Sequence, residues 1–300
     1  MNKPKIIAHR GANRYAPQNT IPAFEKAVEL GADGTETDVH ITKDGHIVIC
    51  HNDTVDEMSN GTGAIGSYMF EDIRKLDFGS KFSKDFAGVT LPTDEEYLEC
   101  MKKSDKLSVM NIEIKPNKSE REDIVRKTIE AVKDYGLFDE LLISSFDYKM
   151  LVEAKKYDPK CKTAYLYPIY GQVVRRWFFQ PLHLAKEIGC DAMHPHKAFA
   201  TKTLVKHAHA AGMKVNAWTV DEEKDVIQML ENGVDGIITD RPDYVEGIVD
   251  RYLAEHKKSL KSKCRRAKAL RYFLLFADCG SHSCEFALTG FPAGELSRSD

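Results

Sequence analysis

The chain has 300 residues, of which 42% are hydrophobic and 30% are charged, as is usual for a globular protein. Its formal net charge of −3 conceals an acidic body. Residues 257–300 hold nine Lys/Arg and four Asp/Glu, which leaves 34 and 42 for residues 1–256, a net charge of −8. This excludes the broadly basic surface that a nucleic-acid partner needs, so we expect no such partner. No run approaches the roughly 18 apolar residues of a membrane span, so we expect no transmembrane segment.

The cysteines and the start of the chain indicate a cytoplasmic protein. No secretory signal is visible before the apolar segment 6–8. Four cysteines of the body have wide, irregular spacing, which is typical of reduced thiols rather than of a disulfide framework. They are Cys50, Cys100, Cys161 and Cys190. The sequence carries no signal for an oligomeric state.

Strand-like and helix-like segments alternate in chain order. We expect strands at 5–8, in the first half of 31–51, and at 107–115, 141–145, 162–167, 191–195, 214–219 and 235–239. We expect helices at 20–30, 92–102, 119–135 and 147–157, in part of the region up to 188, and at 201–211, 221–231 and 241–255. Residues 53–90 have weak periodicity and many turn residues, as in an insertion over one end of a fold.

This alternation predicts a (β/α)8 TIM barrel over residues 1–256, with a small inserted subdomain after the second strand. Several strands are almost continuously apolar, as expected when both faces of a parallel sheet are covered. Eight β/α units over about 250 residues are typical of this barrel. A doubly wound open sheet is the alternative, but no Gly-rich dinucleotide fingerprint follows the first strand.

The stretch from Gly31 to His51 carries the first chemical signal. Glu36 and Asp38 are two residues apart on a strand and therefore share one face. Two buried carboxylates on one face are unfavourable unless a positive group, most simply a divalent cation, lies between them. If Asp44-Gly45 forms a two-residue hairpin loop, paired residue numbers sum to 89 and His51 lies opposite Asp38. A bulged turn would shift this pairing by one residue.

Polar residues at the other strand ends extend the signal, because the carboxyl ends of barrel strands form the active-site face. With Glu113, the acids form an all-oxygen set that suits one divalent cation, Mg²⁺ or Ca²⁺, with Mn²⁺ as the alternative. Arg10 and Lys115 supply positive charge for a phosphate. Two flanking histidines, His9 and His51, suit acid and base catalysis. Further candidates for substrate contact are His194 and Trp218, for which packing roles are the alternative.

Many motifs in this order resemble the glycerophosphodiester phosphodiesterase family, which is related to the phosphatidylinositol-phospholipase-C-like barrel phosphodiesterases. The resemblance spans about residues 5–250. The motifs are His9-Arg10-Gly11, Pro17-Gln18-Asn19-Thr20, Ala23-Phe24, Gly31-Ala32-Asp33, Glu36-Thr37-Asp38-Val39, Thr42-Lys43-Asp44-Gly45, His51, Asn60-Gly61-Thr62-Gly63, Asn111-Ile112-Glu113-Ile114-Lys115, Trp218-Thr219-Val220 and Gly233-Val234-Asp235-Gly236-Ile237-Ile238-Thr239-Asp240.

The resemblance implies metal-dependent hydrolysis of glycerophosphodiesters, a small-molecule substrate class, to glycerol 3-phosphate and an alcohol. It implies three metal ligands (Glu36, Asp38, Glu113), an acid/base pair (His9, His51) and two phosphate contacts (Arg10, Lys115). Two positions depart from the pattern. The family usually has Glu where Gln18 stands, and Asp where Asn52 follows His51.

Two alternative functions remain open on the sequence. A lysophospholipase D-type activity at a lipid surface is suggested by the apolar segments 177–179 and 272–277. A non-catalytic binding barrel is suggested by the departures at Gln18 and Asn52.

The tail, 257–300, does not continue the barrel pattern. It is basic, then apolar, and ends in a region with Cys279, His282 and Cys284. We interpret it as a read-through, frame-altered or cloning-derived segment. A basic amphipathic helix at a membrane surface and a zinc site are the alternatives.

Overall fold

The computed structural model describes residues 2–115, 121–167 and 180–257. Two compact units are distinguished, Met1–Tyr252 and Leu253–Asp300, and the strands of the described residues belong to the first. The predicted domain boundary at residue 256 stays a prediction. The interpretations of the tail as a foreign segment, a membrane-surface helix or a zinc site concern residues outside the described ranges.

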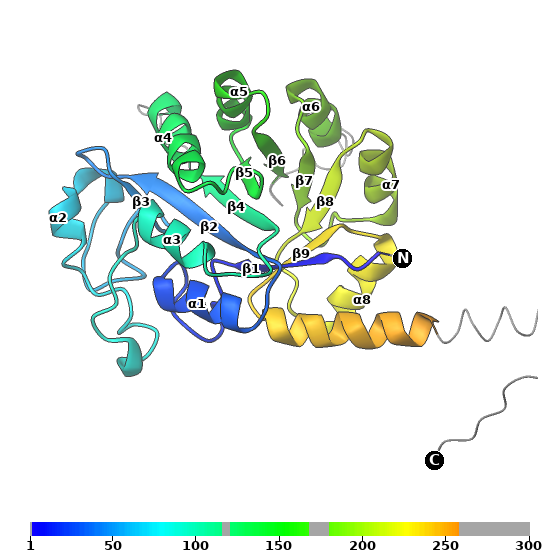
Figure 1. The fold of residues 1–300 in the computed structure, drawn as a ribbon, viewed down its shortest axis with the longest axis horizontal. Helices are drawn as coiled ribbons and strands as arrows, with labels where there is room; N and C mark the ends of the chain where they lie inside the picture. Colours follow the sequence, from blue (N-terminus) through cyan, green and yellow to red (C-terminus); the bar gives the residue numbers. More distant parts are fainter. Residues whose placement is uncertain (1, 116–120, 168–179, 258–300) are drawn as a thin grey trace, which may run out of the picture. The chain divides into compact units, whose positions relative to one another are not determined.

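Eight parallel strands close into a barrel, because β1 pairs with β2 on one side and with β9 on the other (Figure 1). The ninth strand, β3, pairs antiparallel with β2 and is not part of the ring. The predicted TIM barrel is therefore confirmed, and the open sheet is excluded. The strands are β1 (Lys5–His9), β2 (Gly34–Ile41), β3 (Ile47–Ile49), β4 (Val109–Ile114), β5 (Leu141–Ser145), β6 (Lys162–Tyr167), β7 (Ala192–Pro195), β8 (Lys214–Ala217) and β9 (Gly236–Thr239).

The longer helices lie outside the ring of strands (Figure 1). They are amphipathic, and α7, for example, buries Leu204, Val205 and Ala208 on one face. The helices are α1 (Ile21–Glu29), η1 (Ile65–Ser67), α2 (Phe70–Ile73), η2 (Lys84–Phe86), α3 (Asp94–Met101), α4 (Arg121–Asp134), α5 (Tyr148–Tyr157), α6 (Gln180–Ile188), α7 (Lys202–Ala210) and α8 (Glu223–Asn232), followed by a helix over 242–257. Parts of the helical regions predicted at 119–135 and before 188 lie outside the described residues.

The segment between β3 and α3 forms the predicted inserted subdomain. Its apolar core, in which Val55, Ile65, Ile73 and Phe78 pack together, also includes Val48 of β3. The guanidinium of Arg74 donates two hydrogen bonds of 2.8 Å to the carboxylate of Glu96, so α2 is tied to α3. The insertion is therefore a packed unit beside the barrel rather than a loose loop.

The β2–β3 hairpin has the bulged turn, not the two-residue loop. Val39 pairs with Ile49, and Ile41 with Ile47, so the paired numbers sum to 88. The extra residue is accommodated because Gly45 adopts a φ of 85°, a left-handed conformation that favours glycine. Cys50 consequently lies opposite Asp38, and His51 follows one residue later.

Close packing of β2 on β4 brings the acids of the two strands together. A Cβ at Gly34 would lie 1.9 Å from the carbonyl oxygen of Val109, so only glycine allows this approach. In the resulting register, Asp38 is the Cα partner of Glu113. The period of two then puts Glu36 on the same face of β2 as Asp38.

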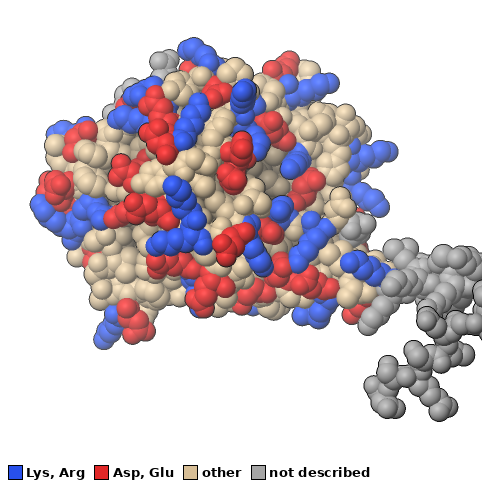
Figure 2. All heavy atoms as spheres, viewed as in Figure 1, with Lys and Arg blue, Asp and Glu red and all other residues tan. Residues whose placement is uncertain are grey.

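Charged side chains of both signs are interspersed over the face of the described part drawn in Figure 2. No extended basic patch is visible there, in line with the acidic composition of the body. Among the described residues, no helix combines the length and the apolar character that crossing a bilayer requires.

Candidate active site

Three buried carboxylates meet at the carboxyl ends of β2 and β4. Glu36, Asp38 and Glu113 each offer a ligand oxygen, and these oxygens lie within 4.8 Å of one another. All three side chains are buried. In the described part of the chain, these three residues form the group that could hold a metal ion.

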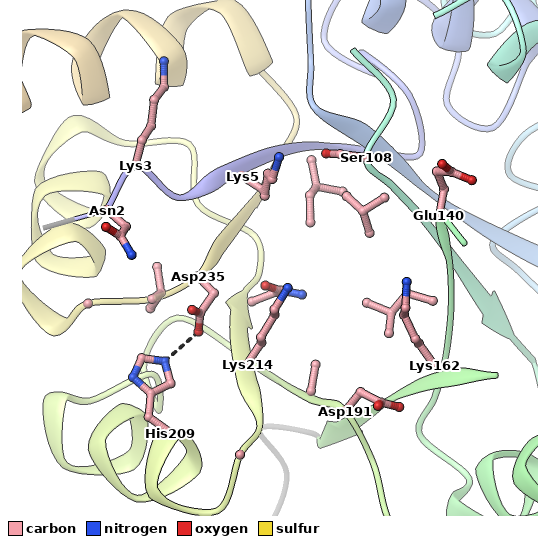
Figure 3. Close-up of a pocket in the computed structure, with 18 of the residues that line it drawn as sticks. Asn2, Lys3, Lys5, Ser108, Glu140, Lys162, Asp191, His209, Lys214 and Asp235 are labelled. Carbon is pink, nitrogen blue, oxygen red and sulfur yellow. Dashed lines mark hydrogen bonds and ion pairs between the residues drawn. The ribbon is translucent and has the colours of Figure 1, made fainter. Parts of the chain in front are cut away.

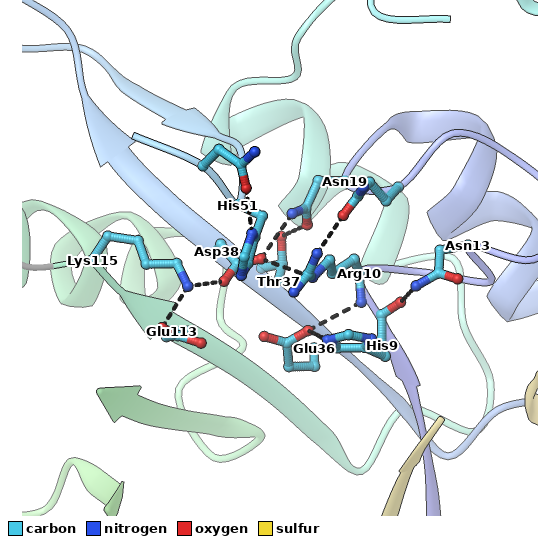
Figure 4. A network of polar contacts seen from close by, with 12 residues as sticks. His9, Arg10, Asn13, Asn19, Glu36, Thr37, Asp38, His51, Glu113 and Lys115 are labelled. Carbon is cyan, nitrogen blue, oxygen red and sulfur yellow. Dashed lines mark hydrogen bonds and ion pairs between the residues drawn. The ribbon is translucent and has the colours of Figure 1, made fainter. Parts of the chain in front are cut away.

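Two basic side chains neutralise part of this charge (Figure 4). The Lys115 ammonium lies 2.8 Å from Asp38 Oδ1 and 2.6 Å from Glu113 Oε1. Arg10 Nε lies 3.6 Å from Asp38 Oδ2. Burial acts to raise the pKa of Asp38, but Lys115 and Arg10 outweigh it and hold that pKa well below its usual value.

The other two acids remain under electrostatic strain. Burial, followed by the charge of Asp38, raises the pKa of Glu36 well above its usual value. Burial also raises the pKa of Glu113 to about 7, although Lys115 opposes the shift. When all three acids are ionised, they carry one more charge than Lys115 and Arg10 balance, and burial opposes that state. Hard oxygen donors of this kind fit a divalent cation, which would keep all three acids ionised and relieve the repulsion.

His9 is anchored by an acid from the last strand of the barrel. Its Nδ1 lies 2.6 Å from Asp240 Oδ1, and its Nε2 lies 3.9 Å from Glu36 Oε2. Asn13 Nδ2 donates to the same Asp240 oxygen at 2.8 Å and to the His9 carbonyl at 2.9 Å. Arg10 has a φ of 56°, and its N–H donates to Glu36 at 3.1 Å. The chain reversal after β1 thereby holds His9 against the acids.

Asp240 is a site residue that the sequence argument left unassigned. The sequence did carry a signal for this residue, because Thr239-Asp240 ends the eighth strand of the barrel, where active-site residues are expected. The carboxylate, held by Asn13, fixes the orientation of the His9 ring. Thr239 and the Asp240 N–H both donate to Asp221, at 2.8 and 2.9 Å, which fixes the strand end itself.

Replacement of Asp240 by asparagine should lower kcat by about 10²–10⁴-fold, since a neutral amide no longer stabilises positive charge on the His9 ring or fixes its orientation through a charged hydrogen bond. Steady-state kinetics and circular dichroism would check this expectation. Asp243, which accepts a hydrogen bond from Tyr15 at the surface, offers the control Asp243→Asn. Equal activity of the two variants would contradict the role of Asp240.

His51 lies beside Asp38 (Figure 4). Its Nδ1 lies 2.6 Å from Asn52 Oδ1, and Asn52 Nδ2 donates to Glu57 Oε2 at 2.7 Å. Burial lowers the pKa of His51 to about 4, with Lys115 and Arg10 adding to the effect and Asp38 opposing it. The ring is therefore neutral near pH 7, so one of its nitrogens carries a free lone pair.

The two remaining candidates, His194 and Trp218, contact each other and neighbouring polar and aromatic residues. His194 on β7 is completely buried, and its Nε2 lies 2.9 Å from the Asn216 amide nitrogen. Trp218 follows β8, is partly exposed, and donates from Nε1 to the His194 carbonyl at 2.8 Å. The Trp218 ring also contacts the rings of Phe146 and His196. Their predicted contact with substrate stays a prediction.

The buried imidazole makes stability depend on pH. Burial lowers the pKa of His194 to about 3, against 6.5 for the free group. Between these values the unfolded chain binds a proton that the folded chain does not, so stability falls as pH falls below 6.5. From pH 7.5 to 5.5 the wild type should lose about 1.4 kcal/mol more than His194→Gln. Urea unfolding at both pH values measures this difference, and the exposed His183→Gln should behave as wild type does.

A pocket of about 340 Å³ adjoins His9 and Arg10. Its barrel side includes Asn13, Pro17, Gln18 and Asp240, and its other side is formed by residues of the insertion. These are Glu57, Met58, Phe78, Lys81 and Phe82. Space for part of a ligand therefore exists between the insertion and the histidine that Asp240 anchors.

A larger pocket, of about 750 Å³, lies where strands begin (Figure 3). There, Asp235 accepts hydrogen bonds from His209 and from the Val215 N–H, at 2.7 and 2.8 Å. Asp191 accepts similarly from the Thr163 N–H at 2.8 Å. These acids satisfy backbone donors at the amino-terminal strand ends, which is the end associated with barrel stability.

Fold and site define a class, namely TIM-barrel enzymes whose active-site face gathers buried acids, basic side chains and two histidines. The chain belongs to the glycerophosphoryl diester phosphodiesterase family, whose model matches residues 9–244. The resemblance inferred from the motifs is thereby confirmed.

Individual relatives agree with the family match. A glycerophosphodiester phosphodiesterase of Caldanaerobacter subterraneus is 41% identical over 247 residues, which cover 82% of this chain and 98% of that protein. The structure of an Oleispira antarctica phosphodiesterase in complex with the product sn-glycerol-3-phosphate matches with a TM-score of 0.74 at 28% identity, covering 82% of this chain and 97% of that one. The crystal structure of a glycerophosphodiester phosphodiesterase from Parabacteroides distasonis matches with a TM-score of 0.71 at 29% identity. The match covers 84% of this chain and 99% of that one.

Proposed function

We propose that this protein hydrolyses glycerophosphodiesters to glycerol 3-phosphate and an alcohol. The observation that carries the proposal is the convergence of three buried acids, two basic side chains and two histidines at one end of a barrel of this family. The relatives named above, including one bound to sn-glycerol-3-phosphate, support the substrate class. Such an activity would belong to lipid and glycerol metabolism.

Arg10 and Lys115 bind the phosphate. Their positive charges stabilise the negative charge that grows on the phosphate oxygens during attack. His51 is the general base, because its ring is neutral and bonded to a neutral amide. His9 is the general acid that protonates the leaving alcohol, since the Asp240 carboxylate stabilises positive charge on its ring. The group that His51 deprotonates is either water or a hydroxyl of the substrate glycerol. Attack by water gives glycerol 3-phosphate directly, whereas attack by the glycerol hydroxyl gives a cyclic phosphate as the alcohol leaves, and water then opens the ring to glycerol 3-phosphate.

Glu36, Asp38 and Glu113 hold one divalent cation. We propose Mg²⁺ or Ca²⁺, with Mn²⁺ as the alternative, because all three donors are hard oxygens. When bound, the cation supplies Lewis-acid withdrawal of charge from the phosphate. Removal of the cation leaves repelling carboxylates, of which only Asp38 has close basic partners on both of its oxygens.

The alcohol side of the substrate occupies the pocket of about 340 Å³ beside His9. This placement gives His9 direct access to the leaving oxygen. Met58, Phe78 and Phe82 provide apolar surface for the head group, whereas Glu57 and Lys81 supply polar contacts. We assign no single alcohol to this pocket.

An activity panel tests the proposal. The full chain should hydrolyse glycerophosphocholine, glycerophosphoethanolamine or glycerophosphoglycerol when Mg²⁺, Ca²⁺ or Mn²⁺ is added, and EDTA should abolish the reaction. Release of glycerol 3-phosphate is the readout. Failure to hydrolyse any member of the panel with any of the three cations would overturn the proposal.

The two alternatives find no support in the described residues. The segments 177–179 and 272–277, which suggested action on lipid surfaces, lie outside them. A binding barrel without catalysis would not require both histidines to be oriented beside the acids, as they are. Lysophospholipid micelles in the same panel would separate the lipid activity from the soluble one.

We also propose a cytoplasmic location. The four cysteines of the described residues are buried free thiols, which suits a reducing compartment. Fractionation of cells that produce the protein, with a secreted enzyme as marker, tests this proposal.

A further inference from the structure

We propose that Glu57, acting through Asn52, is a positioning residue that determines which ring nitrogen of His51 carries the proton. The proposal rests on the proposed function, in which His51 is the general base. It concerns a residue of the insertion that no motif of the sequence had singled out.

The geometry of three side chains carries the inference. His51 Nδ1 lies 2.6 Å from Asn52 Oδ1, and Asn52 Nδ2 lies 2.7 Å from Glu57 Oε2. An ionised carboxylate only accepts hydrogen bonds, so the NH2 group of Asn52 must face Glu57. The amide oxygen then faces His51, and His51 must donate from Nδ1. Glu57 thus selects the orientation of an amide that is otherwise free to turn over.

This selection matters because imidazole has one acceptor nitrogen when it is neutral. With the proton on Nδ1, the lone pair is on Nε2, the nitrogen that makes no contact with Asn52. Reversal of the Asn52 amide would present NH2 to Nδ1, favour the proton on Nε2, and remove the acceptor from the reacting side. Glu57 is thereby linked to catalysis without touching the reacting atoms.

The insertion holds Glu57 in place through its neighbours. The Val55 side chain is buried in the core of the insertion, and its N–H donates to the Gly63 carbonyl at 3.0 Å. The Asp56 carboxylate accepts from the Gly63 N–H at 2.9 Å, and Lys81 donates to the Asp56 carbonyl. The backbone immediately before Glu57 is therefore held by contacts with Gly63 and Lys81.

Glu57 also lines the pocket beside His9. The side chain is exposed in the free protein, so water competes for its hydrogen bond to Asn52. A substrate in that pocket displaces water and strengthens the bond. Occupation of the pocket and orientation of the base are therefore coupled through one carboxylate.

The test combines imidazole ¹⁵N NMR of the metal-free full chain near pH 8 with steady-state kinetics. Wild-type His51 should carry its proton on Nδ1. In Glu57→Ala, the Nε2-protonated form should appear, and kcat should fall about three- to tenfold, the range of one ordinary hydrogen bond, because solvent weakens this exposed one. Adding Asn52→Asp should restore both, because an aspartate next to Nδ1 can only accept.

Glu71, an exposed acid on α2 that does not line the pocket, provides the matched control. Glu71→Ala should leave the tautomer and kcat as in wild type. The inference is overturned if Glu57→Ala keeps the wild-type tautomer, whatever its kcat, or if Asn52→Asp fails to restore the tautomer. Absence of any hydrolysis by the wild type would instead refute the proposed function, while the NMR comparison would still decide the role of Glu57.

Discussion

Replacing either His9 or His51 by alanine is expected to lower kcat for glycerophosphocholine at saturating metal by about 10²–10⁴-fold, the usual contribution of a positioned acid or base. Each imidazole is held by its own partner, His9 by Asp240 and His51 by Asn52, so neither can take over the task of the other. KM should change much less than kcat, because Arg10 and Lys115 retain the phosphate contacts. Stopped-time assays of glycerol 3-phosphate release measure the effect.

His183→Ala serves as the control for this experiment. His183 lies on α6, and its exposed side chain is 3.1 Å from Glu187. It is far along the sequence from His9 of β1 and from His51. Its activity should equal that of wild type. Near-wild-type turnover by His9→Ala and by His51→Ala would show that the acid/base assignment is wrong.

Glu36→Gln is expected to have opposite effects on activity and on the stability of the metal-free protein. Loss of one of three ligands should lower activity by roughly 10²-fold or more. The same change removes a carboxyl whose ionisation burial, Asp38 and Glu113 all oppose, so the metal-free fold should gain about 1–2 kcal/mol. The hydrogen bond from the Arg10 N–H persists, because glutamine also offers an acceptor oxygen.

Thermal unfolding with and without cation distinguishes these effects. A cation at 100 times its Kd should stabilise the wild type by about 2.7 kcal/mol and the variant by much less. Glu99→Gln, which removes an exposed charge from α3, should retain the full stabilisation. A Glu36→Gln protein with wild-type stabilisation by metal would exclude Glu36 as a ligand.

Much of the fold and of the candidate site could be predicted because strands that follow one another in the sequence lie side by side in a parallel barrel. Each strand must end at the same face, so polar residues at strand ends necessarily converge. Glu36 and Asp38 could be paired from the period of two alone. The structure brings these acids together with Glu113, Lys115, Arg10, His9 and His51, the group that strand ends had indicated. The chemical role of each member is a separate question, which the experiments above address.

Other features depended on contacts between distant segments. The pairing of His9 with Asp240 joins residues that are 231 positions apart, and it exists only because β1 closes on β9. His194 is completely buried beside Asn216 of the neighbouring strand β8, a partner that the sequence of its own strand, in which all four residues are buried, did not reveal. Packing of the insertion placed Glu57 behind Asn52, where no strand periodicity applies.

The stretch from Gly31 to His51 illustrates both sides of this division. By itself the sequence determined that two acids share one strand face and that a turn returns a histidine towards them, because side-chain alternation and glycine turns are local properties. Only the tertiary structure decided the pairing register of β2 and β3. The left-handed conformation of Gly45 and the packing of β3 against the insertion favour a bulged turn over a two-residue loop. Likewise, the orientation of the His51 ring follows from Asn52 and Glu57, whose contact depends on how the insertion packs.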